Sequence, residues 1–418
     1  MTKRWHLSPT PPTDQVRTLA SRLNISPTLA ALLVQRGITT FEQAKAYFRP
    51  SLKALHDPWH MKGMDRAVHC LHQAIARQAP ILVYGDYDVD GVTSVVMFYD
   101  FLRRLGVQAK FYIPDRYAEG YGISMQAVEW ASQQGFQLMV SLDCGIRAVA
   151  CVERAKKLGM DVIVCDHHEP GDVLPAADAL LDPKQLDCPY PAKELSGCGV
   201  GFKLLQAYSQ RYGLPLETLY TYLDLVAVSI ACDIVPIVGE NRVLAYHGLQ
   251  QLNKAPRPGL LALMQLGNLC PPLSIADLVF GLGPRINAAG RIDHARLAVE
   301  LLLAPDARTA QGLAQAINEK NTLRRDVDSA MTAEALAMIT AQQHSKRTTV
   351  LFKEDWHKGV VGIVASRCIE QYYRPTVILT AAKGKATGSA RSVVGYNVYQ
   401  AIAACSDLLD QYGGHAAA

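Results

Sequence analysis

The chain has 418 residues, of which 49% are hydrophobic and 19% are charged, and its formal net charge is +4. This composition is typical of a globular protein with sizeable cores, divided into about two to four domains. No apolar run reaches the roughly 18 residues of a membrane span, and no apolar segment follows the basic N-terminus, so we expect a cytoplasmic protein without a membrane partner.

Residues 1–75 are interpreted as a helical lead-in, and from residue 76 short apolar segments alternate with segments of helical spacing. The expected strands are Ile81–Tyr84, Lys110–Pro114, Leu138–Asp143 and Val162–Asp166, and the expected helices between them are Thr93–Leu105, Met125–Ser132 and Ala148–Leu158. This alternation predicts an α/β fold with a mostly parallel sheet and flanking helices, assigned to residues 76–235.

The next part of the chain is expected to be mainly helical, beginning with helices at Leu204–Arg211 and Leu216–Asp233. Residues 236–345 form a helical region in which Gly281–Ile292, rich in glycine and proline, is predicted to be a loop. The alternating polar and alanine-rich pattern of Ala307–Gln343 predicts a long, solvated connecting helix.

Residues 346–418 are predicted to form a second, smaller α/β domain. A strand is expected to begin at Thr348, followed by a helix at Val361–Gln371 and a strand at Thr376–Thr380. From Gln371 to Ser406 there is no acidic residue but four basic ones, so this part of the chain can attract a polyanion although the whole protein is only weakly basic.

Acidic and histidine side chains follow three of the predicted strands. The first strand leads into Asp86, Asp88 and Asp90, the third ends at Asp143, and the fourth ends at Asp166, His167 and His168; Asp233, at the end of a predicted helix, could join them. Because functional groups in an open parallel sheet gather outside the carboxyl ends of the strands, these residues are expected to meet in one cleft.

Such a set of ligands suits a pair of hard divalent cations. Mg²⁺ and Mn²⁺ prefer carboxylate oxygens, and imidazole shifts the preference toward Mn²⁺. Two ions about 3.5–4 Å apart can stabilise the attacking and leaving oxygens of a displacement at phosphorus. Alternation along an extended segment would place Asp86, Asp88 and Asp90 on one side of the chain. A single Asp after a strand is often only a helix N-cap, and for Asp86 that reading is as strong as a metal contact.

These motifs resemble the DHH phosphoesterase superfamily, and within it the RecJ-type single-stranded-DNA exonucleases. The resemblance is carried by Gly85–Ser94, Ser141–Gly145, Asp166–Glu169 and the late Gly413–His415, and it extends from about residue 50 to the end. It implies two bound ions, Mn²⁺ or Mg²⁺, with Asp86, Asp88, Asp90, Asp143, His167 and Asp233 as the ligands. It also implies that His168 is a catalytic acid and that His415 lies over the cleft toward the scissile phosphate.

The residues expected to bind substrate lie in glycine-rich segments. They are Arg116, Asn287, Arg291, Ser389 and Arg391. Guanidinium groups suit phosphate oxygens, and the resemblance implies that the arginines and the Ser389–Arg391 pair bind the nucleic-acid backbone and a 5′ phosphate. A surface salt bridge is the simpler interpretation of any one of these arginines taken alone.

The expected function is a metal-dependent 5′→3′ exonuclease that degrades single-stranded DNA to 5′-mononucleotides in recombination and repair. By resemblance, its partners would be a single-strand-binding protein and a helicase, and the chain would be a monomer. One alternative is a phosphodiesterase for dinucleotides or very short RNA, against which the N-terminal lead-in and the Gly281–Ile292 insertion argue. Another is a non-catalytic nucleic-acid-binding relative, against which the full set of acidic residues argues.

The chain ends at Ala418, shortly after Gly413–His415. The family pattern continues through the second domain and adds an oligonucleotide-binding barrel, so we expect a C-terminally truncated chain with an incomplete second domain. Its hold on single strands should then be weaker, since base stacking contributes ~1–3 kcal/mol per base.

Overall fold

The computed structural model describes residue 5 and residues 7–341, 347–382, 384–410 and 412–414. The chain divides into two compact units. The larger runs to Gly290 and includes His294–Ile317, and the smaller comprises Arg291–Asp293 and the chain from Asn318 onward. Among the helices of the described residues, none has both the length and the apolar character needed to cross a bilayer.

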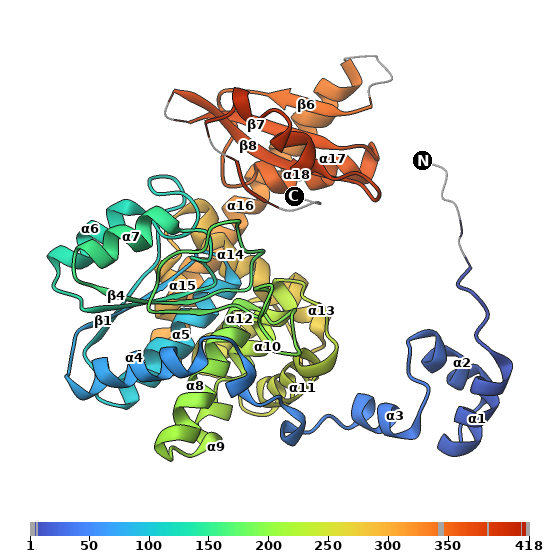
Figure 1. Ribbon diagram of the computed structural model, residues 1–418. Coiled ribbons are helices and arrows are strands. Elements are labelled where there is room, and N and C mark those ends of the chain that lie inside the picture. The colour runs from blue at the N-terminus through green and yellow to red at the C-terminus, as the bar shows by residue number, and fades with distance from the viewer. Residues whose placement is uncertain (1–4, 6, 342–346, 383, 411, 415–418) are drawn as a thin grey trace. The chain divides into compact units, whose positions relative to one another are not determined.

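The larger unit is rich in helices and contains one sheet (Figure 1). The helices up to the unit boundary are α1 (Thr13–Leu23), α2 (Pro27–Gln35), α3 (Phe41–Phe48), α4 (Met64–Ala76), α5 (Val89–Arg104), α6 (Met125–Gln133), α7 (Val149–Lys157), α8 (Gly197–Tyr212), α9 (Leu216–Tyr220), α10 (Leu223–Cys232), α11 (Gly239–Lys254), α12 (Pro258–Leu266), α13 (Ile275–Asp277), α14 (Gly283–Ile292) and α15 (Arg296–Leu302). The strands are β1 (Ile81–Gly85), β2 (Ala109–Tyr112), β3 (Leu138–Leu142), β4 (Asp161–Cys165) and β5 (Ala179–Leu181).

The five strands form a wholly parallel sheet in the order β2-β1-β3-β4-β5. Alternate residues of each strand enter two separate cores, so that Val83 packs with α4, α5 and α8 while Leu82 packs with α6 and α7. Helices therefore cover both faces of the sheet (Figure 1), which confirms the α/β fold predicted from the sequence. The chain connects β1 to β2 on one side of the sheet and then crosses to β3 on the other side of β1. In open α/β sheets a crevice is expected at such a point, at the carboxyl ends of the strands.

The N-terminal helices α1, α2 and α3 form a small hydrophobic core of their own. Ser26 and Thr40 cap the starts of α2 and α3 by accepting hydrogen bonds from backbone amides. Arg242 of α11 donates to the Tyr47 carbonyl at 2.8 Å and lies 3.6 Å from the centre of the Tyr47 ring. The described part of this N-terminal segment is thus mainly helical.

The segment Gly281–Ile292 was predicted to be a loop, and this is wrong. A single π-helical turn, Leu278–Leu282, leads directly into α14. The glycines allow close packing and do not break the helix. A Cβ at Gly283 would lie 2.6 Å from the Cys232 sulfur, and one at Gly290 would lie 2.7 Å from the Tyr87 carbonyl oxygen. Glycine here allows other segments of the chain to approach the helix backbone closely. Composition alone does not distinguish this role of glycine from its role in a turn.

The predicted helix Leu216–Asp233 is in fact two helices, α9 and α10, separated at Thr221 and Tyr222. The Thr221 hydroxyl donates to the Thr218 carbonyl at 2.7 Å, a local bond that competes with continuation of the helix. Asp233 then caps the C-terminal end of α10.

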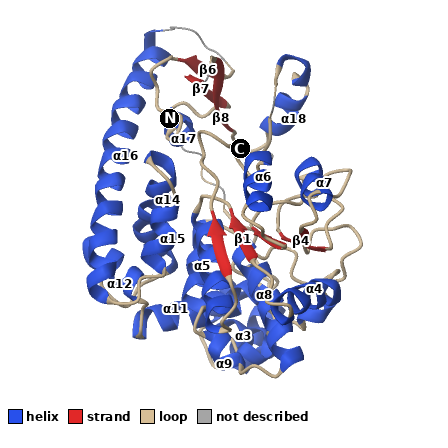
Figure 2. Cartoon of the chain, turned by 90° about the vertical axis from the view of Figure 1, so that its left-hand side faces the viewer, coloured by secondary structure: helices blue, strands red, loops and turns tan. Residues whose placement is uncertain are grey.

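The smaller unit contains the second part of α16 (Ala307–Ala341), whose length is visible in Figure 2, and a three-stranded sheet. The remaining elements are β6 (Thr349–Phe352), α17 (Val361–Gln371), β7 (Thr376–Ala382), β8 (Lys385–Arg391) and α18 (Val398–Ala403). Strands β6 and β7 are parallel, and β7 and β8 are antiparallel. Buried side chains of α16, α17 and this sheet form a separate core, so the chain has the second α/β unit that was expected.

Candidate metal centre

The loop from β1 to α5 supplies three of the expected ligands. Asp86 follows β1 directly, Asp88 caps α5 by accepting a hydrogen bond from the Gly91 amide at 3.0 Å, and Asp90 lies in the first turn. The expectation that all three alternate along an extended segment is wrong, because the helix begins at Val89. The residue that caps the N-terminus of the helix is therefore Asp88, and not Asp86 as had been considered.

Asp143 follows β3 in a backbone conformation that few residues adopt. Its φ is +61°, in the left-handed region, where Asp and Asn are more frequent than other residues with a side chain. Gly197, the first residue of α8, packs against it so closely that a Cβ there would lie 2.6 Å from the Asp143 Cβ. The structure thus fixes Asp143 at the carboxyl end of β3, beside the end of β1.

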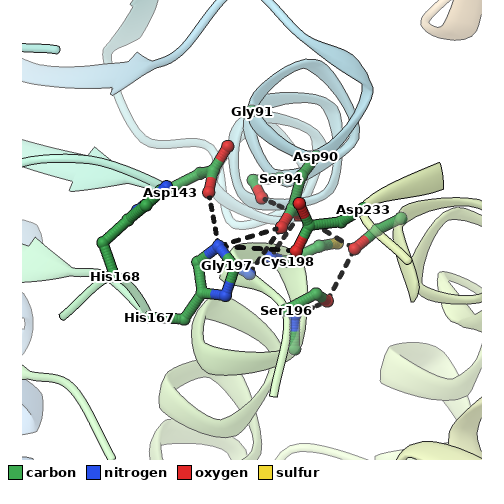
Figure 3. Close-up of polar contacts among 12 residues, drawn as sticks. Asp90, Gly91, Ser94, Asp143, His167, His168, Ser196, Gly197, Cys198 and Asp233 are labelled. Atoms are coloured by element: carbon green, nitrogen blue, oxygen red, sulfur yellow. Dashed lines mark hydrogen bonds and ion pairs between the residues drawn. The ribbon is translucent and has the colours of Figure 1, made fainter. Parts of the chain in front are cut away.

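His167, from the end of β4, lies at the centre of a group of carboxylates (Figure 3). Its Nε2 atom is 3.1 Å from Asp143 Oδ1, 3.6 Å from Asp233 Oδ2 and 3.7 Å from Asp90 Oδ2. These four residues come from four separate segments of the chain. The structure therefore brings together the side chains that the sequence placed at strand and helix ends.

Asp90 is held by the N-terminus of α8. The amides of Gly197 and Cys198 donate to its two carboxylate oxygens at 2.6 and 2.8 Å, and the Ser229 hydroxyl donates at 2.8 Å. A carboxylate at a helix N-terminus is stabilised by the unpaired amides and by the helix dipole. Asp90 is thereby fixed in position while one edge of its carboxylate faces His167 (Figure 3).

The carboxylates are too close together to be ionised without a compensating charge. Burial, reinforced by neighbouring aspartates, raises the pKa of Asp86 and of Asp143 well above the usual range, and it raises the pKa of Asp233 to about 8. The pKa of His167 is lowered by burial, which favours the neutral imidazole that binds metals.

Several ligand atoms of this cluster are buried without a hydrogen bond. Within the described residues, neither Asp86 Oδ1, Asp143 Oδ1 nor either ring nitrogen of His167 has a hydrogen-bond partner, although His167 Nε2 lies close to the carboxylates named above. Three overlapping groups have ligand atoms within 4.8 Å of one another: Asp143, His167 and His168; Asp90, His167 and Asp233; and Asp86, Asp88 and Asp143. Buried polar atoms are normally satisfied, so this donor set fits hard divalent cations, which would supply both the missing contacts and the missing positive charge.

His168 points to a different set of partners. Asp166 Oδ1 accepts from the backbone amides of His167 and His168 and is 2.7 Å from His168 Nδ1. Burial acts to lower the pKa of His168, but the hydrogen bond to Asp166 and the acidic surroundings outweigh it and raise that pKa to about 9. The hydroxyl of Tyr121 lies 2.9 Å from His168 Nε2 and 3.4 Å from its Nδ1.

Among the residues that support the expected ligands, the sequence analysis named only Asp166, without a specific role, and missed the others. Gly197 and Ser229 hold Asp90, Asp166 orients His168, and Tyr121 contacts it. Of these, only Asp166 carried a usable signal, because it stands in the same strand-end motif as the histidines. Gly197 and Ser229 lie more than 100 residues from Asp90 in the sequence, and no local pattern connects them.

Three of the expected substrate-binding residues lie at or near α14. The Arg116 guanidinium lies 3.8 Å from the centre of the Tyr87 ring and donates from Nε to the Gly290 carbonyl at 3.1 Å. Asn287 has a buried Oδ1 that makes no hydrogen bond with any described residue. Arg291 belongs to the smaller unit, where it donates to the Gly359 carbonyl at 3.0 Å.

Ser389 and Arg391 both belong to β8 in the smaller unit, and their side chains lie beside the first turn of α17. Arg391 Nη1 donates to the Ser389 hydroxyl at 2.8 Å, and a Cβ on Gly362 would lie 2.9 Å from Arg391 Nη2. Burial lowers the pKa of Arg391. A guanidinium, a hydroxyl and the amides of a helix N-terminus are groups that bind phosphate. His415 lies outside the described residues.

Comparison with known families and proteins supports the family resemblance that the motifs indicated. The model for "DHH family, N-terminal domain" matches residues 80–230, and the model for "DHHA1 domain" matches residues 345–418. The single-stranded-DNA-specific exonuclease RecJ of Bacillus subtilis is 43% identical over 99% of this chain and 52% of its own length. The RecJ of Salmonella typhimurium is 37% identical over 94% of this chain and 71% of its own length.

Solved structures of RecJ proteins are similar to this chain as well. The crystal structure of RecJ from Thermus thermophilus in complex with Mn²⁺ matches with a TM-score of 0.85 and 32% identity, over 98% of this chain and 58% of that one. A structure of exonuclease RecJ bound to manganese matches with a TM-score of 0.75 and 34% identity, over 85% of this chain and 89% of that one. The chain spans about half the length of the Bacillus subtilis relative. The family resemblance seen in the motifs is confirmed: the chain belongs to the RecJ family of single-stranded-DNA-specific exonucleases, within the DHH family.

Proposed function

We propose that this chain is a metal-dependent exonuclease that degrades single-stranded DNA from the 5′ end and releases 5′-mononucleotides. The observation that carries the proposal is the group of three carboxylates around His167 at the point where the sheet order reverses, in a chain of this family. That crevice is where open α/β sheets bind their ligands. The names of the relatives do not favour the alternative of a dinucleotide phosphodiesterase.

Two divalent cations, Mn²⁺ or Mg²⁺, are the proposed cofactors, and the relatives crystallised with these ions support the assignment. The residues that would hold them are Asp86, Asp88, Asp90, Asp143, His167 and Asp233. When bound, such ions polarise the phosphate, lower the pKa of water and neutralise charge on the attacking and leaving oxygens.

The protein's own side chains would provide orientation and a proton. Hydrolysis that yields a 5′-mononucleotide breaks the bond between phosphorus and O3′ of the terminal nucleotide, and a water oxygen becomes bonded to phosphorus. The departing O3′ needs a proton, and Asp166 holds His168 through its Nδ1 atom at 2.7 Å, beside the proposed ligands Asp143 and His167. We assign His168 the role of the acid. The group formed by Ser389, Arg391 and the start of α17 is the proposed binding site for the 5′ phosphate.

A strand with a 5′ label tests the activity. With Mn²⁺, the label should be released first, as a mononucleotide, and EDTA should abolish release. A bulky group at the 5′ end should protect the strand, whereas the same group at the 3′ end should not, and the matching duplex should resist digestion. Earlier release of a 3′ label, equal digestion of the duplex, or cleavage of dinucleotides alone would contradict the proposal.

Replacing Arg391 with alanine should weaken binding of a 5′-phosphorylated oligonucleotide about tenfold or more, since a hydrogen bond to a charged group contributes ~1.5–3 kcal/mol. Fluorescence anisotropy in EDTA measures this binding without hydrolysis. Lys385→Ala is the matched control, because Lys385 begins the same strand, carries the same charge and has an exposed side chain paired only with Asp410 among the described residues. Equal losses in both variants would mean that Arg391 contributes only general charge.

A further inference from the structure

A cavity of about 470 Å³ lies in the smaller unit, where the starts of β6 and β7 meet the end of β8. The proposed metal ligands belong to the larger unit, and neither Ser389 nor Arg391 lines this cavity. It is therefore distinct from both sites described above. The lining residues that matter for its chemistry are Arg347, Tyr373, Arg374, Pro375 and Tyr396.

Hydrogen bonds join the three segments that enclose the cavity. The Thr349 amide donates to the Pro375 carbonyl at 2.9 Å, which connects the segments that lead into β6 and β7. The Val394 amide donates to the Tyr373 hydroxyl at 3.2 Å, which connects the segment after β8 to the same place. Three parts of the chain thus form the walls of the cavity in a defined arrangement.

The charge of the cavity is positive. Both Arg347 and Arg374 line it, and Arg374 is positioned by a hydrogen bond from its Nε to the Thr349 hydroxyl at 2.8 Å. None of the described lining residues is acidic, and most of them come from Gln371–Ser406, the stretch that contains no Asp or Glu. The cavity therefore suits an anionic ligand, and it gives a location to the basic stretch noted in the sequence.

Two aromatic rings line the same cavity and keep much of their surface exposed. Tyr373 is 54% exposed and Tyr396 is 43% exposed. Arginines beside exposed aromatic rings are the combination that binds single-stranded nucleic acids, because phosphates pair with the guanidinium groups while unpaired bases stack on the rings. A duplex keeps the faces of its bases inside its own stack, and an acidic peptide has no bases to stack.

We propose that this cavity binds a nucleotide within a single strand of DNA, with its base on Tyr373 or Tyr396 and its phosphates at Arg347 and Arg374. The identity of the ligand rests on the proposed function. The volume is adequate, since ligand pockets commonly measure ~300–1,000 Å³. Because the cavity is separate from the Ser389–Arg391 group, it should hold a strand whether or not that strand has a 5′ phosphate.

The first test is binding of a thymidine oligonucleotide with a 5′ hydroxyl, measured by fluorescence anisotropy in EDTA. Tyr396→Ala should weaken binding about fivefold or more, as expected for a lost stacking partner, whereas Tyr396→Phe keeps the ring and should match the wild type. Tyr396 is chosen because the Tyr373 hydroxyl also holds the Val394 amide. Tyr212→Ala removes a tyrosine of similar exposure from the end of α8, and as the matched control it should bind normally.

The salt dependence of the same binding separates charge from stacking. Arg347→Ala should reduce the slope of log affinity against log salt by about 0.7, the value for one phosphate contact on a single strand. Tyr396→Ala should leave that slope unchanged. Lys385→Ala is the matched control for charge, because Lys385 is exposed in the same unit but lies outside the cavity lining, and it should change neither slope nor affinity.

Photocrosslinking locates the bound strand. A strand that contains 5-iododeoxyuridine should attach to Tyr373 or Tyr396 of the wild type, as identified by mass spectrometry of its peptides. Unweakened binding by Tyr396→Ala, an equal loss in Tyr212→Ala, or crosslinks found only outside the cavity would overturn the inference. So would displacement of the strand by free thymidine monophosphate or by polyglutamate as effectively as by unlabelled strand. A wild type that binds no single strand would instead contradict the proposed function.

Discussion

Asp143→Asn should abolish strand cleavage, with kcat/KM reduced at least ~1000-fold, while the metal-free protein becomes more stable. The catalytic loss follows because a carboxylate 3.1 Å from His167 is replaced by a neutral amide, and metal ions contribute several kcal/mol of charge stabilisation in such reactions. Asn is the suitable replacement, since it tolerates the φ of +61° at this position nearly as well as Asp. The backbone should therefore stay in place, and the charge alone is removed.

The gain in stability follows from the sign of the pKa shift. Burial and the charge of Asp90 raise the pKa of Asp143 well above its usual range. A group whose pKa is higher in the folded than in the unfolded protein favours folding at low pH, and this contribution is lost as the pH rises through the folded-state pKa. At pH 8 the metal-free variant should therefore melt at a higher temperature than the wild type, and the difference should shrink as the pH falls toward ~4.

Added Mn²⁺ should reverse this order. The wild type should gain stability in proportion to the logarithm of free metal over Kd, whereas the variant, which lacks one proposed ligand, should gain much less. Thermal melts at several Mn²⁺ concentrations, with calorimetric titration of the same samples, measure both effects. Asp172→Asn removes the same charge from an exposed position and should change neither. If Asp143→Asn bound Mn²⁺ as tightly as the wild type, Asp143 would not be a ligand.

The sequence predicted that these side chains lie together, because the main members of the cluster obey a topological rule. Asp86, Asp143 and His167 each follow a buried strand, and parallel strands end at the same edge of a sheet. Asp233 was harder to place, since it ends a helix and reaches His167 only through the packing of α10 against α5 and α8. Its position at a predicted helix end only allowed it to join the cluster, and the family resemblance implied that it is a ligand.

What could not be predicted depends on contacts between distant parts of the chain. Gly197 lies ahead of the predicted helix Leu204–Arg211, and the sequence did not indicate that its missing side chain makes room for Asp143. The glycines of α14 suggested a loop for the same reason, because a sequence shows that a residue is small without showing what lies beside it. Tyr121 lies five residues after Arg116 in the sequence, but only the fold shows that it contacts His168.

Gly197→Ala is expected to cause a second large loss of activity, because its one added methyl group should displace two proposed ligands together. In Gly197→Ala the new Cβ would lie 2.6 Å from the Asp143 Cβ and 2.7 Å from its Oδ1, both inside normal contact distance. The amide of the same residue donates to Asp90 at 2.6 Å, so a shift of α8 that relieves the clash would move Asp90 as well. Misplacement of reacting groups by ~1 Å can reduce rates about 100-fold, and overpacking costs about 1–3 kcal/mol of stability.

Gly199→Ala separates this explanation from a general effect on the helix. Gly199 is two residues further along α8, and a Cβ there would lie 3.4 Å from the Ser196 hydroxyl and 3.5 Å from Leu195, which is ordinary contact. Alanine is also the better helix former, so Gly199→Ala should keep full activity and melt no lower than the wild type. Gly197→Ala should lose at least ~100-fold in kcat/KM and in Mn²⁺ affinity. Similar behaviour of the two variants would mean that the approach of α8 to Asp143 does not position the ligands.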